Sequence, residues 1–80
     1  MLESIVEHYE GEELLKADGF DDAVIGIDEK TMRLIYSVSK CLDILKKEMN
    51  EEDTIEHFLY NVSGSYVGEK THIWCWDTFI

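Results

Sequence analysis

The sequence contains no proline, no internal repeat and no stretch of low complexity. None of its 80 residues form a linker of the kind that separates domains, and a chain of this length is expected to hold one domain. We therefore expect a single domain over residues 1–80. It would have a helical N-terminal segment over residues 1–19 and a core over residues 20–80 with the element order ββααβ.

Cysteine is scarce, and its placement excludes the common cysteine-based sites. Cys41 and Cys75 fall in different predicted elements, and the chain has no Cys-x-x-Cys motif, which zinc knuckles and thiol redox sites use. His72 is spaced too irregularly from Cys75 for a zinc knuckle. We expect two reduced, buried thiols and no bound metal.

Long apolar runs are missing as well. No stretch approaches the roughly 20 apolar residues that cross a membrane. Residues 1–10 carry acidic side chains where a secretory signal would have basic and then apolar ones. We therefore expect a cytoplasmic protein without a membrane partner.

Basic side chains are few. Seven lysines and arginines face eighteen acidic residues, which gives a net charge of −11. Direct contact with nucleic acid or with an anionic membrane requires clustered lysine and arginine, so we expect neither as a partner. The acidic surplus lies in residues 1–22 and 51–80. It serves either solubility or a surface that binds a basic partner.

A catalytic constellation is also lacking. Residues 64–71 resemble a phosphate-binding loop only in outline, because Glu69 precedes Lys70 and the segment that follows is predicted as a strand. Ser63 and Ser65 lie near glycine but without the pattern that surrounds an activated nucleophile. We expect no enzyme activity and no cofactor.

Apolar residues at helical spacing predict the helices. Leu2, Ile5, Val6 and Tyr9 form a short N-terminal stripe, and we expect a further helical turn that ends near Gly19.

The next two helices follow each other closely. The apolar stripe of the first follows Ser37 or Ser39 as N-cap, and Asn50 caps the second, whose first turn is acidic. The residues expected to be buried are Val38, Cys41, Leu42, Leu45 and Met49 in the first helix and Ile55, Phe58, Leu59 and Val62 in the second.

Three apolar runs predict strands. Residues 23–27 are expected as a strand buried on both faces, and residues 32–37 as its hairpin partner after a polar turn at 28–31. Residues 71–77 form the last strand, which we expect to lie beside the first. Together these elements predict an α+β fold, in which a small three-stranded antiparallel or mixed sheet packs on the helix pair.

Several side chains are candidates for contact with a partner. Trp74 and Trp76 share one face of the last strand, where they serve either the core or an interface. The acidic candidates are either a solvated surface or part of a binding surface. The full set of candidate contact residues, acidic and aromatic, is Asp18, Asp21, Asp22, Glu51, Glu52, Asp53, Glu56, Tyr66, Trp74 and Trp76.

Residues 19–26, 33–37, 51–58 and 66–71 resemble small uncharacterised acidic proteins of tailed bacteriophages, and the resemblance extends over residues 19–77. It implies a phage origin and a setting in the host cytoplasm, but no activity that transfers to particular residues. By analogy with other small acidic phage proteins, it suggests a protein that blocks a host enzyme or defence system, in some cases by imitating the charge of nucleic acid.

Two functions follow as hypotheses. The first is an inhibitor or modulator that binds a host protein with a basic surface. The second is a structural or assembly module in which the chain pairs with copies of itself, most simply as a homodimer.

Overall fold

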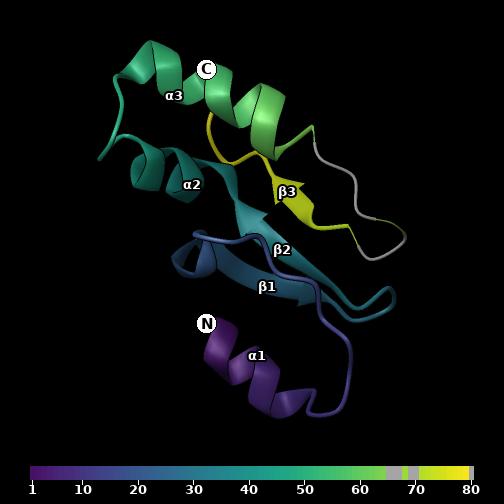
Figure 1. Cartoon of the computed structure of the whole chain (residues 1–80). Helices are drawn as coiled ribbons and strands as arrows, with labels where there is room; N and C mark the ends of the chain where they lie inside the picture. The colour runs from purple at the N-terminus through teal and green to yellow at the C-terminus, as the bar shows by residue number, and fades with distance from the viewer. Residues whose placement is uncertain (65–67, 69–70, 80) are drawn as a thin grey trace.

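The computed structural model describes residues 1–64, 68 and 71–79. Its elements are α1 (Leu2–His8), the 3-10 turn η1 (Asp21–Ala23), β1 (Val24–Asp28), β2 (Arg33–Ser37), α2 (Val38–Leu45), α3 (Glu51–His57), the π-helical turn η2 (Phe58–Val62) and β3 (Ile73–Cys75). The predicted α+β fold is confirmed, with a three-stranded mixed sheet, a helix pair and a short N-terminal helix (Figure 1).

The strands lie in the order β1-β2-β3. β1 and β2 form the predicted antiparallel hairpin, in which Asp28 pairs with Arg33. β3 runs parallel to β2, with Trp74 opposite Tyr36. The expectation that the last strand lies beside the first was therefore wrong. A parallel pair needs a long crossover connection, which α2 and α3 supply, while α1 contacts β1.

β1 is an edge strand and is less buried than its apolar sequence suggested. Val24 is buried, but Ile25, Gly26 and Ile27 are only partly covered. A strand buried on both faces was the wrong expectation for this segment. The central strand is β2, whose Leu34, Tyr36 and Ser37 are buried.

The segment between α1 and the sheet is irregular and does not form the predicted helical turn near Gly19. It ends in a tight turn in which the Phe20 N–H donates to the Ala17 carbonyl at 3.2 Å. Gly19 takes φ +86° there, a conformation that glycine adopts without steric cost. The Ala17 N–H donates to the hydroxyl of buried Tyr36 at 2.8 Å. This hydrogen bond ties the segment to β2 in place of helical hydrogen bonds.

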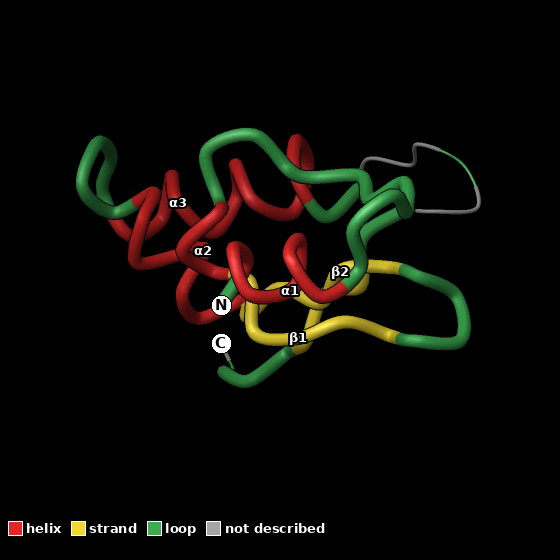
Figure 2. The backbone as a smooth tube through the Cα atoms, turned by 90° about the horizontal axis from the view of Figure 1, so that it is seen from below, coloured by secondary structure: helices red, strands yellow, loops and turns green. Residues whose placement is uncertain are grey.

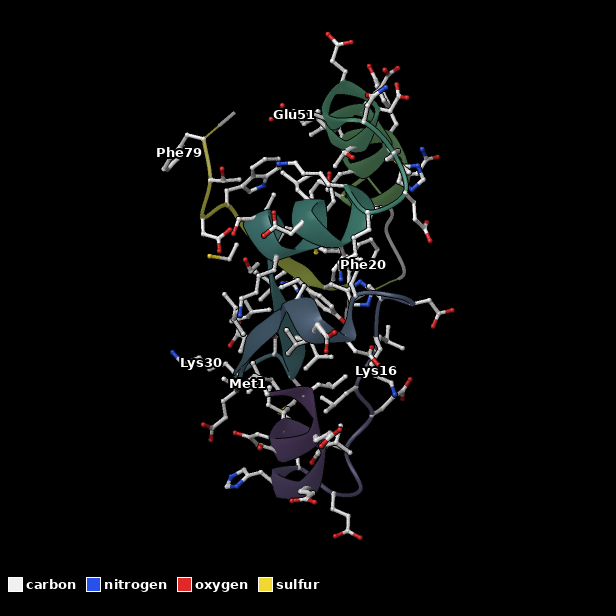
Figure 3. All side chains as sticks on the ribbon, turned by 90° about the vertical axis from the view of Figure 1, so that its left-hand side faces the viewer. Met1, Lys16, Phe20, Lys30, Glu51 and Phe79 are labelled. Carbon is white, nitrogen blue, oxygen red and sulfur yellow. The ribbon has the colours of Figure 1, made fainter. Side chains whose placement is uncertain are left out.

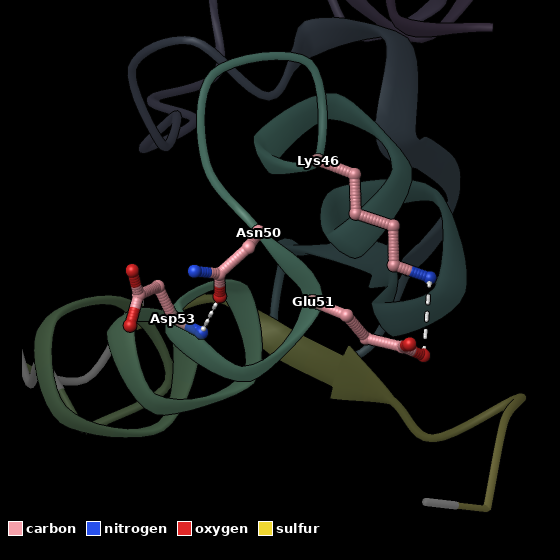
Figure 4. Close-up of polar contacts among 4 residues, drawn as sticks. All are labelled: Lys46, Asn50, Glu51 and Asp53. Carbon is pink, nitrogen blue, oxygen red and sulfur yellow. Dashed lines mark hydrogen bonds and ion pairs between the residues drawn. The ribbon is translucent and has the colours of Figure 1, made fainter.

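The two predicted helix caps are present. The Ser37 hydroxyl accepts from the Lys40 N–H at 3.1 Å, and the Asn50 side chain accepts from the Asp53 N–H at 2.8 Å (Figure 4). These bonds satisfy amides that have no partner within the first turn of a helix. α2 buries Val38, Cys41, Leu42 and Leu45, as its sequence predicts. The helix ends before Met49, which is only partly covered, so the prediction was wrong for that residue.

α3 buries a narrower face than expected. Thr54 and Phe58, one turn apart, are buried, whereas Ile55 and Val62 are partly covered and Leu59 is 44% exposed. The prediction that Leu59 is buried was therefore wrong. α3 lies at one end of the molecule (Figure 1), where it contacts α2 and where Phe58, directly after it, packs against Trp74.

The body is elongated, with extents of 39 × 23 × 20 Å. Figure 1 shows α1 below β1 at one end and α3 above β3 at the other, and Figure 2 shows α1 lying across the strands. The core between them consists of Leu2, Ile5, Phe20, Ala23, Val24, Leu34, Tyr36, Val38, Cys41, Leu42, Leu45 and Phe58.

We expect Tyr36→Phe to destabilise the fold by about 1 kcal/mol, because the Ala17 N–H loses its acceptor in a partly buried place. Urea denaturation measures the loss, and amide exchange at Ala17 localises it. Tyr60→Phe is the matched control, since Tyr60 is 77% exposed. It should change the free energy of unfolding by less than about 0.5 kcal/mol. Equal effects of the two substitutions would contradict this role of the Tyr36 hydroxyl.

Candidate binding surface

Carboxylates project from both ends of the long axis (Figure 3). One group surrounds α1, and the other surrounds the labelled Glu51 at the start of α3. The apolar core lies between the two groups, as the labelled Phe20 shows. Acidic side chains therefore reach both ends of the molecule, while others, such as Asp21, Asp22 and Asp77, lie beside α2.

The outer side of α3 and η2 combines acidic with large apolar side chains. Glu52, Asp53 and Glu56 are exposed, and so are Leu59 and Tyr60 at 44% and 77%. Helical spacing places Asp53, Glu56 and Tyr60 along one line. We use the name α3 surface for the set Glu51, Glu52, Asp53, Ile55, Glu56, Leu59 and Tyr60.

Glu51 is the member of this surface that has a cationic neighbour. Its Oε1 lies 4.0 Å from the Lys46 Nζ (Figure 4). Both side chains are largely exposed, so the pair contributes little to stability. Within the part of the chain that the structure describes, Glu52, Asp53 and Glu56 have no ion-pair partner.

Two shallow hollows flank a ridge on the α3 surface. Glu56 and Tyr60 border both hollows. On one side, Ile55 and Leu59 line a hollow of about 410 Å³. On the other side, a hollow of about 500 Å³ reaches His57. The surface therefore offers an apolar side and a polar side to a partner.

Two aromatic side chains link the sheet to α3. Trp74 packs edge-on against Phe58, with ring centroids 5.3 Å apart, and Trp76 contacts the same ring at 6.0 Å. Trp74 is partly buried against the core, whereas Trp76 is 43% exposed. The two candidate tryptophans therefore have different surroundings, and Trp76 is the more accessible to a partner.

His72 completes this aromatic cluster beside Tyr36, with ring centroids 5.3 Å apart. Burial lowers the pKa of His72, and a hydrogen bond to the backbone of Lys16 opposes that shift. The imidazole is therefore uncharged at neutral pH. It serves as part of the wall of the cluster and not as a cation.

Asp77 fastens the chain after β3 to the start of α2. One carboxylate oxygen accepts from the Ser37 hydroxyl at 2.5 Å, and the other accepts from the Ser39 N–H at 2.9 Å. Trp76 precedes this contact directly, so the contact positions its ring against Phe58. Phe79 follows it and is 96% exposed, and it projects away from the body in Figure 3.

The remaining acidic candidates lie elsewhere. Asp21 and Asp22 line a separate hollow of about 340 Å³ with Glu3 of α1 and Lys40 of α2. Asp18 borders a hollow that also contains His57 and Trp74. Tyr66 lies outside the described residues. The structure thus gathers Glu51, Glu52, Asp53 and Glu56 on α3 and separates Asp21 and Asp22 from them.

Sequence reasoning did not select Tyr60, Leu59 or His57. A signal for Tyr60 was present, because a residue two positions after buried Phe58 points to the opposite side of a helix. The exposure of Leu59 has no such signal. It depends on how narrowly α3 contacts its neighbours, which is a tertiary property.

Among the described residues no cluster of three or more histidine, cysteine, aspartate or glutamate side chains is placed to hold a metal ion. Burial, with a smaller contribution from Asp77, raises the pKa of Cys41 to about 12, so its thiol stays protonated. No helix in the described ranges is long and apolar enough to cross a membrane.

Comparison of the sequence with the known protein families, with curated proteins and with solved structures finds no match.

We expect Asp77→Asn to lower the free energy of unfolding at pH 7 by about 1 kcal/mol, because it weakens the hydrogen bonds that the carboxylate accepts from Ser37 and Ser39. The loss stays this small because solvent screens the exposed carboxylate. The hydrogen bond from Ser37, followed by that from the Ser39 N–H, lowers the pKa of Asp77 below its ordinary value of 3.8. Its stabilisation is therefore present above pH 3.8 and disappears as the pH falls through the folded-state pKa.

Urea midpoints of wild type and Asp77→Asn, measured from neutral to acidic pH, test this expectation. The two should differ at pH 7 and converge in acid. Asp43→Asn is the control, because Asp43 is exposed on α2, the same helix that Asp77 contacts. A constant difference at every pH would refute the contribution of the ionised carboxylate.

Proposed function

We propose that this protein acts by binding a partner protein with a basic surface, and that the α3 surface makes the contact. One observation carries the proposal. Carboxylates without an ion-pair partner in the described part of the chain (Glu52, Asp53 and Glu56) border large exposed side chains (Leu59 and Tyr60) on a single helix.

The two kinds of side chain have separate roles in such a contact. Exposed carboxylates attract a basic surface over a distance and accelerate association, and this attraction weakens as salt increases. Apolar and aromatic side chains supply most of the binding free energy once water is excluded, and tyrosine is enriched at the centres of interfaces. Tyr60 on the ridge and Leu59 beside it are suited to that second role.

The proposed partner is a host enzyme or defence protein in the host cytoplasm, as the resemblance to phage proteins implies. Binding would inhibit or modulate that protein. A groove that normally holds nucleic acid is a suitable target, because it is lined with lysine and arginine. The carboxylates of α3 would then occupy the place of phosphates.

Assembly of copies of this chain is the second candidate, and exposed Trp76 and Phe79 support it. Symmetric pairing through the α3 surface would place Glu52 and Glu56 against the same residues of another copy. That arrangement is unfavourable because like charges repel. Copies would have to meet through Trp76 and Phe79 instead.

We expect the double substitution Glu52→Gln and Glu56→Gln to weaken binding to the partner about tenfold, because two attractive charges are removed. Candidate partners are first recovered from a bacterial lysate at low ionic strength and identified by mass spectrometry. Calorimetry with the purified partner then gives the dissociation constant at low and at high ionic strength.

Glu3→Gln with Glu7→Gln is the matched control. It removes the same charge at the same spacing from α1, at the other end of the molecule. This variant should bind almost as tightly as wild type. Equal losses for the two pairs, or affinity that is independent of salt, would contradict contact through α3.

Sedimentation of the purified chain over a range of concentrations separates the two candidates. We expect a monomer. A dimer that dissociates when Trp76 and Phe79 are replaced by serine, while the Glu52 and Glu56 variant stays dimeric, would favour assembly through the C-terminal aromatic side chains instead.

A further inference from the structure

Three hollows in the surface share His57. The first, of about 500 Å³, lies beside Met49 and the ridge of the α3 surface. The second, of about 430 Å³, reaches Trp74 of β3, and the third, of about 390 Å³, reaches Lys47 near the end of α2. Asp18 borders both the second and the third. We use the name His57 groove for these three hollows together.

The His57 groove is built from segments that are far apart in the sequence. The turn before β1 contributes Asp18 and Phe20, α3 contributes His57, and β3 contributes Trp74. Concave sites of this kind, between elements and in the size range of about 300–1,000 Å³, are typical of places where ligands and side chains bind.

The charge of the groove selects a cationic occupant. Asp18, Glu48, Asp53 and Glu56 border it, and Lys47 is the one lysine or arginine among the described residues that line it. A phosphate or a carboxylate would be repelled by this set. A lysine or arginine side chain in the hollow that reaches Trp74 would lie beside the Asp18 carboxylate and an aromatic ring.

Two ring nitrogen atoms lie inside the aromatic wall that Trp74 and His72 form in the groove. Trp74 Nε1 and His72 Nε2 are shielded from solvent and have no hydrogen-bond partner in the part of the chain that is described. Buried polar atoms normally have partners, so each of these atoms calls for an explanation. Atoms that solvent does not reach are not available to a docked segment either, so the groove offers such a segment the ring of Trp74 and not these nitrogen atoms.

We infer that the His57 groove receives a short segment of the partner protein, with a lysine or arginine side chain beside Asp18 and the ring of Trp74. This inference rests on the proposed function. It adds the kind of segment that is bound and the side of the Glu56–Tyr60 ridge on which it lies.

The test uses the full chain labelled with ¹⁵N and a capped peptide that alternates leucine and arginine. Trp76→Phe leaves one indole N–H signal, that of Trp74, in the spectrum. We expect this signal to shift on titration with the peptide. A capped peptide that alternates leucine and glutamate should leave it unchanged.

Variants inside and outside the His57 groove locate the contact with the peptide. Asp18→Asn and His57→Ala should each raise the dissociation constant of the peptide about twofold to fivefold, as for exposed charge pairs and partly exposed contacts. Asp43→Asn, on α2 and outside the residues that line the groove, should leave it unchanged. Urea denaturation of every variant shows that the fold is intact.

The same variants, tested against the identified partner, distinguish failure of the inference from failure of the proposed function. If the Glu52 and Glu56 pair weakens partner binding while Asp18→Asn and His57→Ala do not, the groove inference is overturned and the proposed function stands. If Asp43→Asn weakens binding of the peptide as much as Asp18→Asn does, the inference is overturned as well. If neither the α3 pair nor the groove variants weaken partner binding, both proposals are overturned.

Discussion

The side chain of Tyr36 is the contact on which the rest of this small fold depends. Its ring is fully buried in the central strand and meets both His72 and Trp74 of the C-terminal segment. Its hydroxyl accepts from the backbone of Ala17, which follows α1. One side chain therefore joins the N-terminal segment, the hairpin and the last strand. Such a contact matters more in a domain of this size, because a small domain buries a lower fraction of its surface than a large one does.

This arrangement also determines where the charge lies. The core occupies the middle of a body 39 Å long, and two of the groups of carboxylates lie at its ends. The Debye length is about 8 Å at physiological ionic strength, so the two acidic ends scarcely repel each other. A net charge of −11 is thus compatible with a compact fold. It also leaves each end with an acidic surface of its own.

Much of the fold could be predicted from local signals. The caps at Ser37 and Asn50, the hairpin and the buried face of α2 all depend on neighbouring residues, and all were confirmed. Strand order was predicted wrongly, because apolar runs do not encode which strands pair. The prediction of a helical turn before Gly19 was wrong for a related reason. The Ala17 N–H donates to the hydroxyl of Tyr36, which is 19 residues away in the sequence, and not to a carbonyl of a helix. The acidic residues of α3 were selected correctly as exposed, but the groove around His57 joins three distant segments and has no local signature.

The π-helical turn at Phe58–Val62 has a consequence for the length of this segment. Its closing hydrogen bond, from the Ser63 N–H to the Phe58 carbonyl at 2.8 Å, encloses one residue more than an α-helical turn would. Losing a single residue there would restore regular α-helical bonding. Each residue accounts for about 100° of rotation in an α-helix, so the side chains beyond the deletion would face a different direction. The number of residues in the turn Phe58–Val62 therefore determines which side chains of this segment face solvent. Relatives with the same number of residues there would expose the same positions.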